Sequence, residues 1–494
     1  MSNLRSESRC FAFALGIWLP FAAANAAEVD ARVLAHAQSG GEVDVLLVLA
    51  EQSRPLLPLS PQAGSRAYRR ALVDALRARA DHTQRDVRAW LNARGIEHHD
   101  FWIANLIQAR VAATSLAELA TRDELVRIDP NPVIALQRPL VQSAPASTLG
   151  VAWGVAKIEA PQLWAAGYTG QGVVIGGEDT GYQWNHPALK PHYRGWNGLI
   201  ADHNHNWHDA IHDSVGNPCN NDAAAPCDDD GHGTHTAGTF IGDDGAGNQI
   251  GVAPGARWIG CRNMDQGNGT PARYIECMQW MLAPTDLAGN NANPDLAPDI
   301  VSNSWGCPAS EGCATGLEIQ GAVDTLVDAG IFYVVAAGND GSACATILDA
   351  PAIYDAGFVV GATTSGDALA SFSSRGPVVG SALIRPDASA PGVSVTSSYP
   401  FDTYQVLSGT SMAAPHVAGA AALLISAFPA LKGRPREIAS ILRQAAATQG
   451  VTDPIVQSCG GTSRSRWPNN MIGSGRIDVW NAYRDIILID GFDD

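Results

Sequence analysis

Five short apolar runs, separated by segments in which apolar residues recur at helical spacing, place the strongest constraint on the fold of this chain. Each run is almost continuously hydrophobic, as in strands that are covered on both faces. The runs are Val173–Gly176, Trp258–Cys261, Ile300–Ser302, Ile331–Ala336 and Phe358–Val360. Strands that alternate with helices form mainly parallel sheets. We therefore predict a three-layer α/β/α domain with a mainly parallel central sheet.

A smaller α+β domain is predicted ahead of these runs. Val43–Leu49 indicates a buried strand, and Arg66–Ala93 has helical spacing until Gly95 ends the helix. The other expected elements are a strand at Phe101–Val111, a helix at Ser115–Thr121 with Ser115 as N-cap, and a strand at Val126–Ile128. Residues 27–140 are assigned to this domain.

The first residues are typical of a secretory signal. Arg5 and Arg9 precede the apolar run Phe11–Ala24, and the small residues Ala24 and Ala26 frame a cleavage site. A membrane anchor is the alternative, but the run is shorter than the roughly 20 residues that span a bilayer. We expect a signal peptide at 1–26, and a mature form without a membrane anchor, extracellular or periplasmic.

A stretch with Pro and Ser, Pro139–Thr148, separates the two predicted domains, and proteolysis concentrates in such exposed segments. We assign residues 141–150 to a linker and processing region, 151–485 to the main domain and 486–494 to an acidic tail.

The charge of the chain is unevenly distributed. The net charge is −17, with +1 in residues 1–150 and −18 in residues 151–494. Nucleic-acid binding requires clustered Lys and Arg, so an acidic main domain excludes nucleic acid as the expected partner.

The cysteines indicate disulfides. Cleavage of the signal removes Cys10 and leaves eight, an even number that fits an oxidising compartment. Cys219 with Cys227 and Cys307 with Cys313 are close enough to form local bridges. The remaining four, which can pair in several ways, are Cys261, Cys277, Cys344 and Cys459. Zinc is the alternative, but the Cys-x2-Cys spacing of a structural site is absent and no metal site is assigned.

Three motifs contain residues that together could perform nucleophilic catalysis. Asp179 ends an apolar run in VVIGGEDTG, His232 begins a helix of small residues in GHGTHTAGT, and Ser411 lies at the start of a buried helix in SGTSMAAPHVAG. A serine hydroxyl needs a base, an imidazole can take and return its proton, and a carboxylate orients the ring. We also expect Pro415 in the first turn of the serine helix.

Each residue has a simpler interpretation. Asp179 could cap a turn, Ser411 could cap its helix, and His232 could bind zinc with His235. Taken together, and in the chain order Asp, His, Ser, the three motifs favour catalysis.

The sequence from about Val151 to Tyr483 resembles the subtilisin-like serine proteases (subtilases, peptidase S8). Beyond the three motifs, the likeness includes VVAAGND and FSSRGP. It implies the subtilisin-like fold and an endopeptidase that hydrolyses proteins or peptides through an acyl-enzyme intermediate. Asp179, His232 and Ser411 would be the triad, and Asn339 the oxyanion-hole donor beside the Ser411 backbone N–H.

The resemblance also implies a substrate groove in which a peptide pairs as an added strand. Its walls would be Ser304, Trp305 and Gly306, and Ala336, Ala337 and Gly338. Trp305 is bulkier than the aliphatic residue often found there, so we expect a modified side pocket. Asp349 is expected near the base of the primary pocket, where it would favour a basic side chain.

The N-terminal domain resembles a subtilisin propeptide, which implies an intramolecular inhibitor and folding template that the enzyme removes itself. No cofactor is expected to be required, and we expect a monomer. Structural calcium is common in the family; Asp209, Asp228, Asp229 and Asp230 offer oxygen ligands, but none is assigned. A catalytically silent peptide-binding protein is the alternative function, and the sequence does not separate bulk digestion from the processing of one dedicated substrate.

Overall fold

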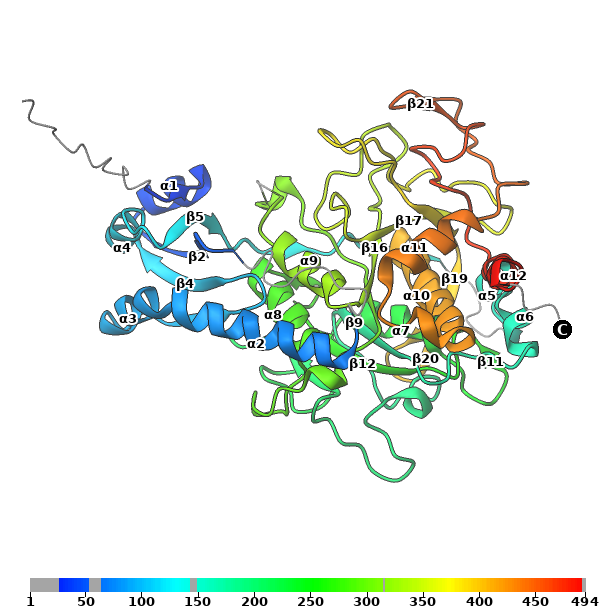
Figure 1. The fold of residues 1–494 in the computed structure, drawn as a ribbon, viewed down its shortest axis with the longest axis horizontal. Helices are drawn as coiled ribbons and strands as arrows, with labels where there is room; N and C mark the ends of the chain where they lie inside the picture. The colour runs from blue at the N-terminus through cyan, green and yellow to red at the C-terminus, as the bar shows by residue number, and fades with distance from the viewer. Residues whose placement is uncertain (1–25, 53–63, 143–148, 314–315, 491–494) are drawn as a thin grey trace, which may run out of the picture.

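The computed structural model describes residues 26–52, 64–142, 149–313 and 316–490. A small N-terminal domain lies at one end of the molecule, beside a larger domain that contains the rest of the described chain (Figure 1). The expected signal peptide falls almost entirely outside the described residues, as do positions 143–148 of the linker.

The N-terminal domain is built on a five-stranded sheet with the strand order β1-β5-β2-β4-β3. The strands are β1 Glu28–Val29, β2 Glu42–Leu49, β3 His98–Phe101, β4 Leu106–Ala112 and β5 Leu125–Pro130, and the helices are α1 Ala31–Gln38, α2 Arg66–Thr83, α3 Arg85–Ala93 and α4 Ala113–Leu119. The domain is α+β, as predicted.

Three local predictions for this domain were wrong. The helix expected at 66–93 is two helices that meet at Gln84, whose side-chain amide donates to Phe101 O and Asn105 Oδ1. The single strand expected at 101–111 is divided by a turn in which Asn105 has a φ of 44°. The N-cap of α4 is Ala112 and not Ser115, which lies inside the helix.

The larger domain contains a seven-stranded parallel sheet with the order β10-β12-β9-β15-β16-β17-β18. Its strands are β9 Val174–Asp179, β10 Trp207–Asp209, β12 Arg257–Arg262, β15 Ile300–Asn303, β16 Phe332–Ala336, β17 Phe358–Thr363 and β18 Ala388–Pro391. All five apolar runs are strands of this sheet, which confirms the parallel α/β prediction.

Helices cover both faces of the sheet and complete the three layers. They are α5 Trp153–Lys157, α6 Ala160–Ala165, α7 His232–Ile241, α8 Pro271–Leu282, α9 Gln320–Asp328, α10 Thr410–Ala427, α11 Pro435–Gln444 and α12 Val479–Asp490. Alternate residues of one strand face opposite layers: Ile300 packs in the cluster that contains α7 and α10, and Val301 in the cluster that contains α8 and α9. Helix α12 includes residues 486–490, so the acidic tail predicted to begin at 486 is wrong for these residues.

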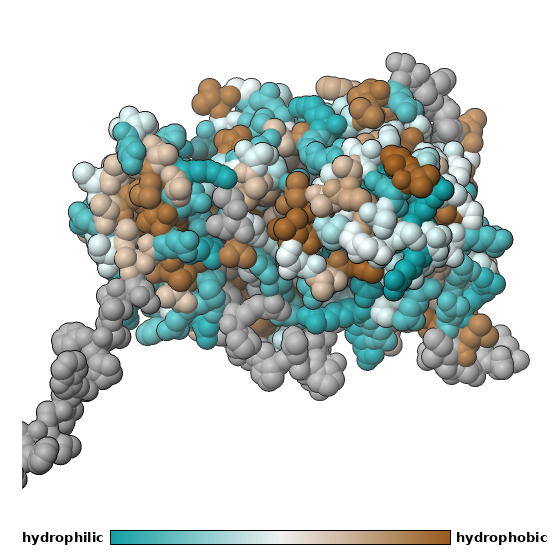
Figure 2. Space-filling model, turned by 90° about the horizontal axis from the view of Figure 1, so that it is seen from above, coloured by the Kyte–Doolittle hydropathy of each residue, from teal (hydrophilic) through white to brown (hydrophobic). Residues whose placement is uncertain are grey.

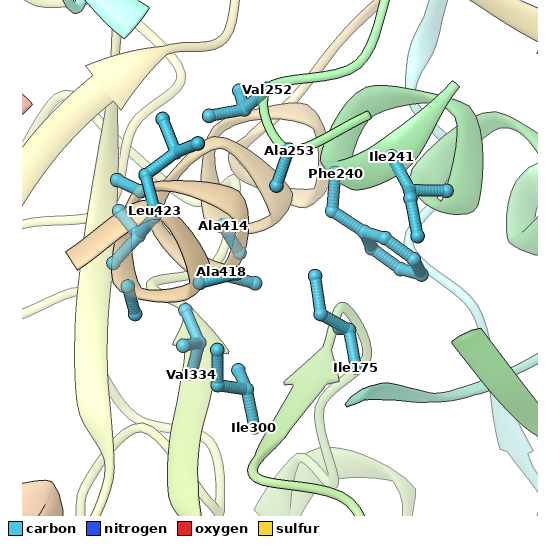
Figure 3. Packing of buried hydrophobic residues seen from close by; sticks show 14 of the residues in the cluster. Ile175, Phe240, Ile241, Val252, Ala253, Ile300, Val334, Ala414, Ala418 and Leu423 are labelled. Atoms are coloured by element: carbon cyan, nitrogen blue, oxygen red, sulfur yellow. The ribbon is translucent and has the colours of Figure 1, made fainter. Parts of the chain in front are cut away.

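Helix α10 lies at the centre of the domain because it is built of small and apolar residues. Ala414, Ala418 and Leu423 belong to the same buried cluster as Ile300 and Val334 of the central strands (Figure 3). The helix has the length and mean hydropathy of a membrane span, but 89% of its 18-residue window is buried inside the protein. It is therefore the core helix of a globular domain.

The N-terminal domain extends the apolar core on the side of α8 and α9. Leu72, Leu76 and Phe101 belong to the same buried cluster as Ile275 of α8 and Ala322 of α9. Figure 1 shows this domain beside the ends of those helices. In the view from above, the surface is mostly hydrophilic, with hydrophobic residues in separate patches (Figure 2).

Four disulfides connect the eight cysteines of the larger domain. The bridges Cys219–Cys227 and Cys307–Cys313 are the two local pairs that were predicted. The other four cysteines pair as Cys261–Cys277 and Cys344–Cys459. The first of these ties β12 to α8, and the second joins segments that are 115 residues apart.

The remaining strands form small ribbons around the main sheet. They are β6 Ile134–Ala135, β7 Leu140–Gln142, β8 Gly150–Val151, β11 Asn248–Gln249, β13 Met264–Asp265, β14 Asn268–Gly269, β19 Val395–Tyr399, β20 Thr403–Ser408, β21 Ser458–Cys459 and β22 Thr462–Ser463.

Candidate active site

Asp179 and His232 are in direct contact at the C-terminal edge of the central sheet. Asp179 is the last residue of β9 and His232 the first of α7, and both are buried. Since a carboxylate accepts, the Nδ1–H of His232 donates to Asp179 Oδ1 at 2.7 Å. Burial opposes charge on the ring, but the carboxylates of Asp179, Asp230 and Asp228 together outweigh it and raise the pKa of His232 above its ordinary value.

The glycines around His232 allow α7 to pack against the loop after β9. A Cβ on Gly233 would lie 2.1 Å from the carbonyl oxygen of Gly181, so no larger residue fits there. Gly231, the N-cap, has a φ of 101°, which favours glycine. This local geometry explains why the histidine of the motif is flanked by glycines.

His235 does not join His232 in a metal site. Its Nε2–H points to the carbonyl oxygens of Val395 and Gln405, each 3.1 Å away. Burial lowers the pKa of His235 to about 3, so this ring is a neutral core residue.

Ser411 is the second residue of α10, and its side chain is buried. Its hydroxyl donates to Ser304 O at 3.0 Å, and the Ser304 hydroxyl donates to Ser411 O at 3.1 Å. The N-cap of the helix is Gly409, so Ser411 is not a capping residue. The Nε2 of His232 is buried and has no hydrogen-bond partner in the described part of the chain, and α7 packs against α10.

Pro415 lies in the second turn of α10, and the expected first-turn position was wrong. A residue at 415 would normally donate its N–H to the carbonyl oxygen of Ser411, four residues earlier, but proline has no N–H. The Ser304 hydroxyl supplies the missing donor to Ser411 O.

Asn339 follows β16 and is held by the start of α10. Its Oδ1 accepts from the Thr410 N–H at 2.9 Å and from the Thr410 hydroxyl at 3.0 Å. Because the oxygen is engaged in this way, the Nδ2 group remains as a donor beside Gly409, whose added Cβ would lie 3.7 Å from it.

A single cavity brings together the predicted groove residues and the start of α10. Ser304, Trp305, Gly306, Ala336, Ala337 and Gly338 all line it, together with Asn339, Thr410 and Ser411. The two segments lie at the C-terminal ends of β15 and β16, which are neighbours in the sheet. Trp305 is buried: its ring stacks on Tyr274, with centroids 3.7 Å apart, and its Nε1–H donates to Glu178 O at 3.1 Å.

Asp349 also lines this cavity. A Cβ on Gly306 would lie 3.3 Å from the Cβ of Asp349. Asp349 has no hydrogen-bond or ion-pair partner among the described residues, and burial together with Asp340 and Glu311 raises its pKa to about 6. The cavity therefore contains a carboxyl group, that of Asp349, without a positively charged partner among the described residues.

The chain that connects the two domains runs along this cavity. β6 pairs antiparallel with β14, and β7 pairs antiparallel with β20. The sequence does not predict the strand edge of residues 267–269, because Asn268-Gly269 is a turn signal. Tyr274 explains the glycine at 269: an added Cβ would lie 2.3 Å from its ring.

The four aspartates named as calcium donors are engaged by protein groups. Asp228 accepts from Thr180 and Thr234, Asp209 and Asp229 face Arg262, and Asp230 pairs with Arg138. No group of three or more His, Cys, Asp or Glu side chains in the described ranges is arranged to hold a metal ion. These residues do not fit a calcium site, and calcium stays a prediction without assigned ligands.

The sequence of this chain is similar to those of known proteins of one family. The signature of the subtilase family matches residues 170–473. Bacillopeptidase F of Bacillus subtilis (strain 168) is 36% identical over 437 residues, which cover 84% of this chain but only 28% of that protein. Subtilisin DY of Bacillus licheniformis is 35% identical over 283 residues, covering 57% of this chain and 86% of that protein. Subtilisin BL of Lederbergia lenta is 32% identical over 335 residues, covering 68% and 99%.

Proposed function

This chain belongs to the subtilase family of serine-type endopeptidases, and on that premise we propose that it hydrolyses peptide bonds in proteins with Ser411 as nucleophile. The observation that carries the proposal is the Asp179–His232 contact of 2.7 Å, with a buried and unpartnered Nε2 on the other side of the ring. That atom is suited to take the proton of Ser411 on the adjoining helix.

The proposed reaction follows from the hydrogen bonds of the site. Ser411 Oγ–H turns from Ser304 O to His232 Nε2 and attacks the substrate carbonyl carbon as the proton passes to the ring. Asn339 Nδ2–H and the Ser411 backbone N–H stabilise the oxyanion. His232 then gives the proton to the leaving amine, and water hydrolyses the ester. Asp179 holds the imidazole tautomer and stabilises its charged form.

The substrate class is argued from the acid in the cavity. Asp349 has neither a cation nor a hydrogen-bond donor beside it, and Asp340 lies close enough to raise its pKa. A lysine or arginine side chain preceding the cleaved bond would supply the missing positive charge. A preference for basic residues at that position is therefore part of the proposal.

Secretion and synthesis as an inactive precursor belong to the same proposal. Four disulfides are typical of a protein from an oxidising compartment, which supports an extracellular or periplasmic location. The N-terminal domain packs on α8 and α9, and its connection to the larger domain runs along the cavity, which supports intramolecular inhibition. The monomeric state stays a prediction.

A serine-directed phosphonate probe tests the central claim. We expect mass spectrometry to locate the label at Ser411, and Ser411→Ala to abolish both labelling and casein hydrolysis. Asp179→Asn should lower kcat by about 10⁴, and Asn339→Ala by about 10²–10³. Thr346→Ala, outside the cavity lining, is the control that should keep activity.

A catalytically silent peptide-binding protein is the outcome to exclude. A folded protein, free of its N-terminal domain, that is neither labelled nor active on casein would establish it and refute the peptidase proposal. Digestion of a peptide library then separates bulk digestion, with many cut sites, from dedicated processing, with few.

A further inference from the structure

The segment 134–142 crosses the candidate active site from one side to the other. On the first side, Asn268 and Gly269 pair with Ala135 and Ile134, and the Leu136 N–H donates to Gly267 O at 2.7 Å. These contacts hold the incoming chain as an added antiparallel strand, the arrangement in which proteins bind extended peptides. The chain itself therefore lies in the position of a bound peptide.

Gln137 lies at the cavity that contains Ser411. Leu136 and Gln137 line this cavity together with Asn339 and Ser411. The side-chain amide of Gln137 donates to Asp340 Oδ2 at 2.9 Å, and its Oε1 accepts from the Asn339 N–H at 3.2 Å. This side chain, which is exposed, therefore lies at the edge of the cavity that we assign to the substrate residue before the cleaved bond.

Beyond Gln137 the chain passes the start of α10 and leaves on the other side. A Cβ on Gly409 would lie 3.5 Å from Pro139 Cβ, so the chain runs directly beside the turn that precedes Ser411. It then forms β7, in which Leu140 pairs with Ser408 and Gln142 with Val406. The backbone of residues 137–139 thus passes Ser411 between two hydrogen-bonded anchors.

We infer that the bond between Gln137 and Arg138 is the one at which the precursor cuts itself; this inference rests on the proposed function. Ser411 Oγ forms an ester with the carbonyl carbon of Gln137 while the bond to the Arg138 nitrogen breaks. The proton of Ser411 passes through His232 to that nitrogen. Water then hydrolyses the ester, which gives a carboxylate on Gln137 and restores the serine hydroxyl.

The next bond, between Arg138 and Pro139, does not fit as well. The Arg138 side chain leaves the cavity to pair with Asp230 and to donate to Gln266 O. The Pro139 nitrogen also carries the pyrrolidine ring in place of a hydrogen. The predicted cut lies upstream of the processing region 141–150 that was expected from composition.

The two ends created by the cut provide the test. Full-length precursor should be sampled by intact mass during the first minutes after folding, beside the Ser411→Ala precursor. We expect a released fragment that ends at Gln137 and an enzyme that begins Arg138-Pro139-Leu140, and no cut in Ser411→Ala. Reading the end of the fragment as well as the start of the enzyme separates the first cut from later trimming.

Substitutions of Gln137 test the side chain in the cavity. Gln137→Glu places a third carboxylate near Asp340 and Asp349 and should slow the cut about tenfold. Gln137→Lys supplies a cation and should make it faster than in the natural chain. Gln38→Glu makes the same charge change at an exposed helix end of the same domain and should leave the rate unchanged.

The possible failures are distinguishable. A Ser411-dependent first cut at another bond, or equal rates for the Glu and Lys variants, overturns the inference and leaves the peptidase proposal intact. The same holds if casein is hydrolysed by a precursor that stays uncut. Absence of both self-cleavage and Ser411 labelling in the folded protein refutes the proposed function itself.

Discussion

Ser304 and Ser411 exchange two hydrogen bonds, each hydroxyl donating to the carbonyl oxygen of the other residue, at 3.1 and 3.0 Å. One bond replaces the donor that Pro415 lacks, and the other holds the hydroxyl of the proposed nucleophile away from His232. These hydrogen bonds thus join the residue that follows β15 to the start of α10, at the point where we place the reaction.

Ser304→Ala should destabilise the protein by about 1–3 kcal/mol, because it leaves the buried Ser411 carbonyl without a donor. The measurement is denaturant unfolding of the Ser411→Ala precursor, which keeps the backbone carbonyl and prevents self-digestion. Ser302→Ala is the control: in the described structure that hydroxyl is buried but has no partner, so its loss should cost little. Equal effects of the two substitutions would contradict the role given to Ser304.

Glu178 should make the stability of the protein fall as the pH rises. Burial raises its pKa to about 8 from an ordinary 4.5, and a hydrogen bond from Tyr333 offsets only part of this shift. Its contribution is full below about pH 4.5 and is lost toward pH 8, at no more than about 1.4 kcal/mol per pH unit. Glu178→Gln should remove this fall in unfolding free energy, whereas Glu437→Gln, at an exposed position, should not. Parallel pH profiles for natural chain and Glu178→Gln would refute the prediction.

Asp349 should make the preference for a basic side chain depend on pH. Its pKa is about 6, so the carboxylate charge is present above that value and lost below it. The ratio of kcat/KM for a lysine peptide to that for its norleucine analogue should rise through pH 6 by about tenfold. Taking the ratio cancels the titration of His232, which affects both peptides.

Asp349→Asn should lower this ratio and make it independent of pH, and Asp355→Asn, at an exposed position, should change neither. A lysine preference that survives in Asp349→Asn would show that another acid recognises the substrate.

The longest disulfide loop and one of the two short loops should differ in their effect on stability. Cys344–Cys459 spans 115 residues and Cys219–Cys227 spans 8. On the chain-entropy account, replacing the first pair by serine should cost about 5 kcal/mol and replacing the second about 2.5 kcal/mol. Denaturant unfolding of the two double variants in the Ser411→Ala precursor measures the difference, and a larger loss for the short loop would contradict it.

Much of this architecture was predictable because it depends on local pattern. Runs such as Phe358–Val360 are continuous in apolar residues because the strand is covered on both faces, and every such run is a strand of the sheet. The break at Gln84 was not predictable, since it depends on hydrogen bonds to Phe101 and Asn105, which are distant in sequence.

The residues of the candidate site could be located from the sequence where they belong to a recognisable motif. The motifs pointed to residues that lie together: Asp179 contacts His232, and the six expected groove residues line one cavity, while their roles stay a prediction. The pairing of Ser304 with Ser411 and the edge at residues 267–269 could not be foreseen. Both depend on contacts with backbone carbonyl groups of segments that are distant in sequence, and the sequence alone does not show which segments meet.

The ladder between β7 and β20 has a kinetic consequence for the proposed cut. The amine of Arg138, once released from Gln137, stays anchored through β7, which begins two residues later at Leu140. It does not diffuse away, and its effective concentration beside the acyl-enzyme stays high. Resealing of the bond therefore competes with hydrolysis until that ribbon opens. The rate at which the ribbon peels from the groove, as much as the chemistry at Ser411, would then determine how fast the precursor commits to its mature form.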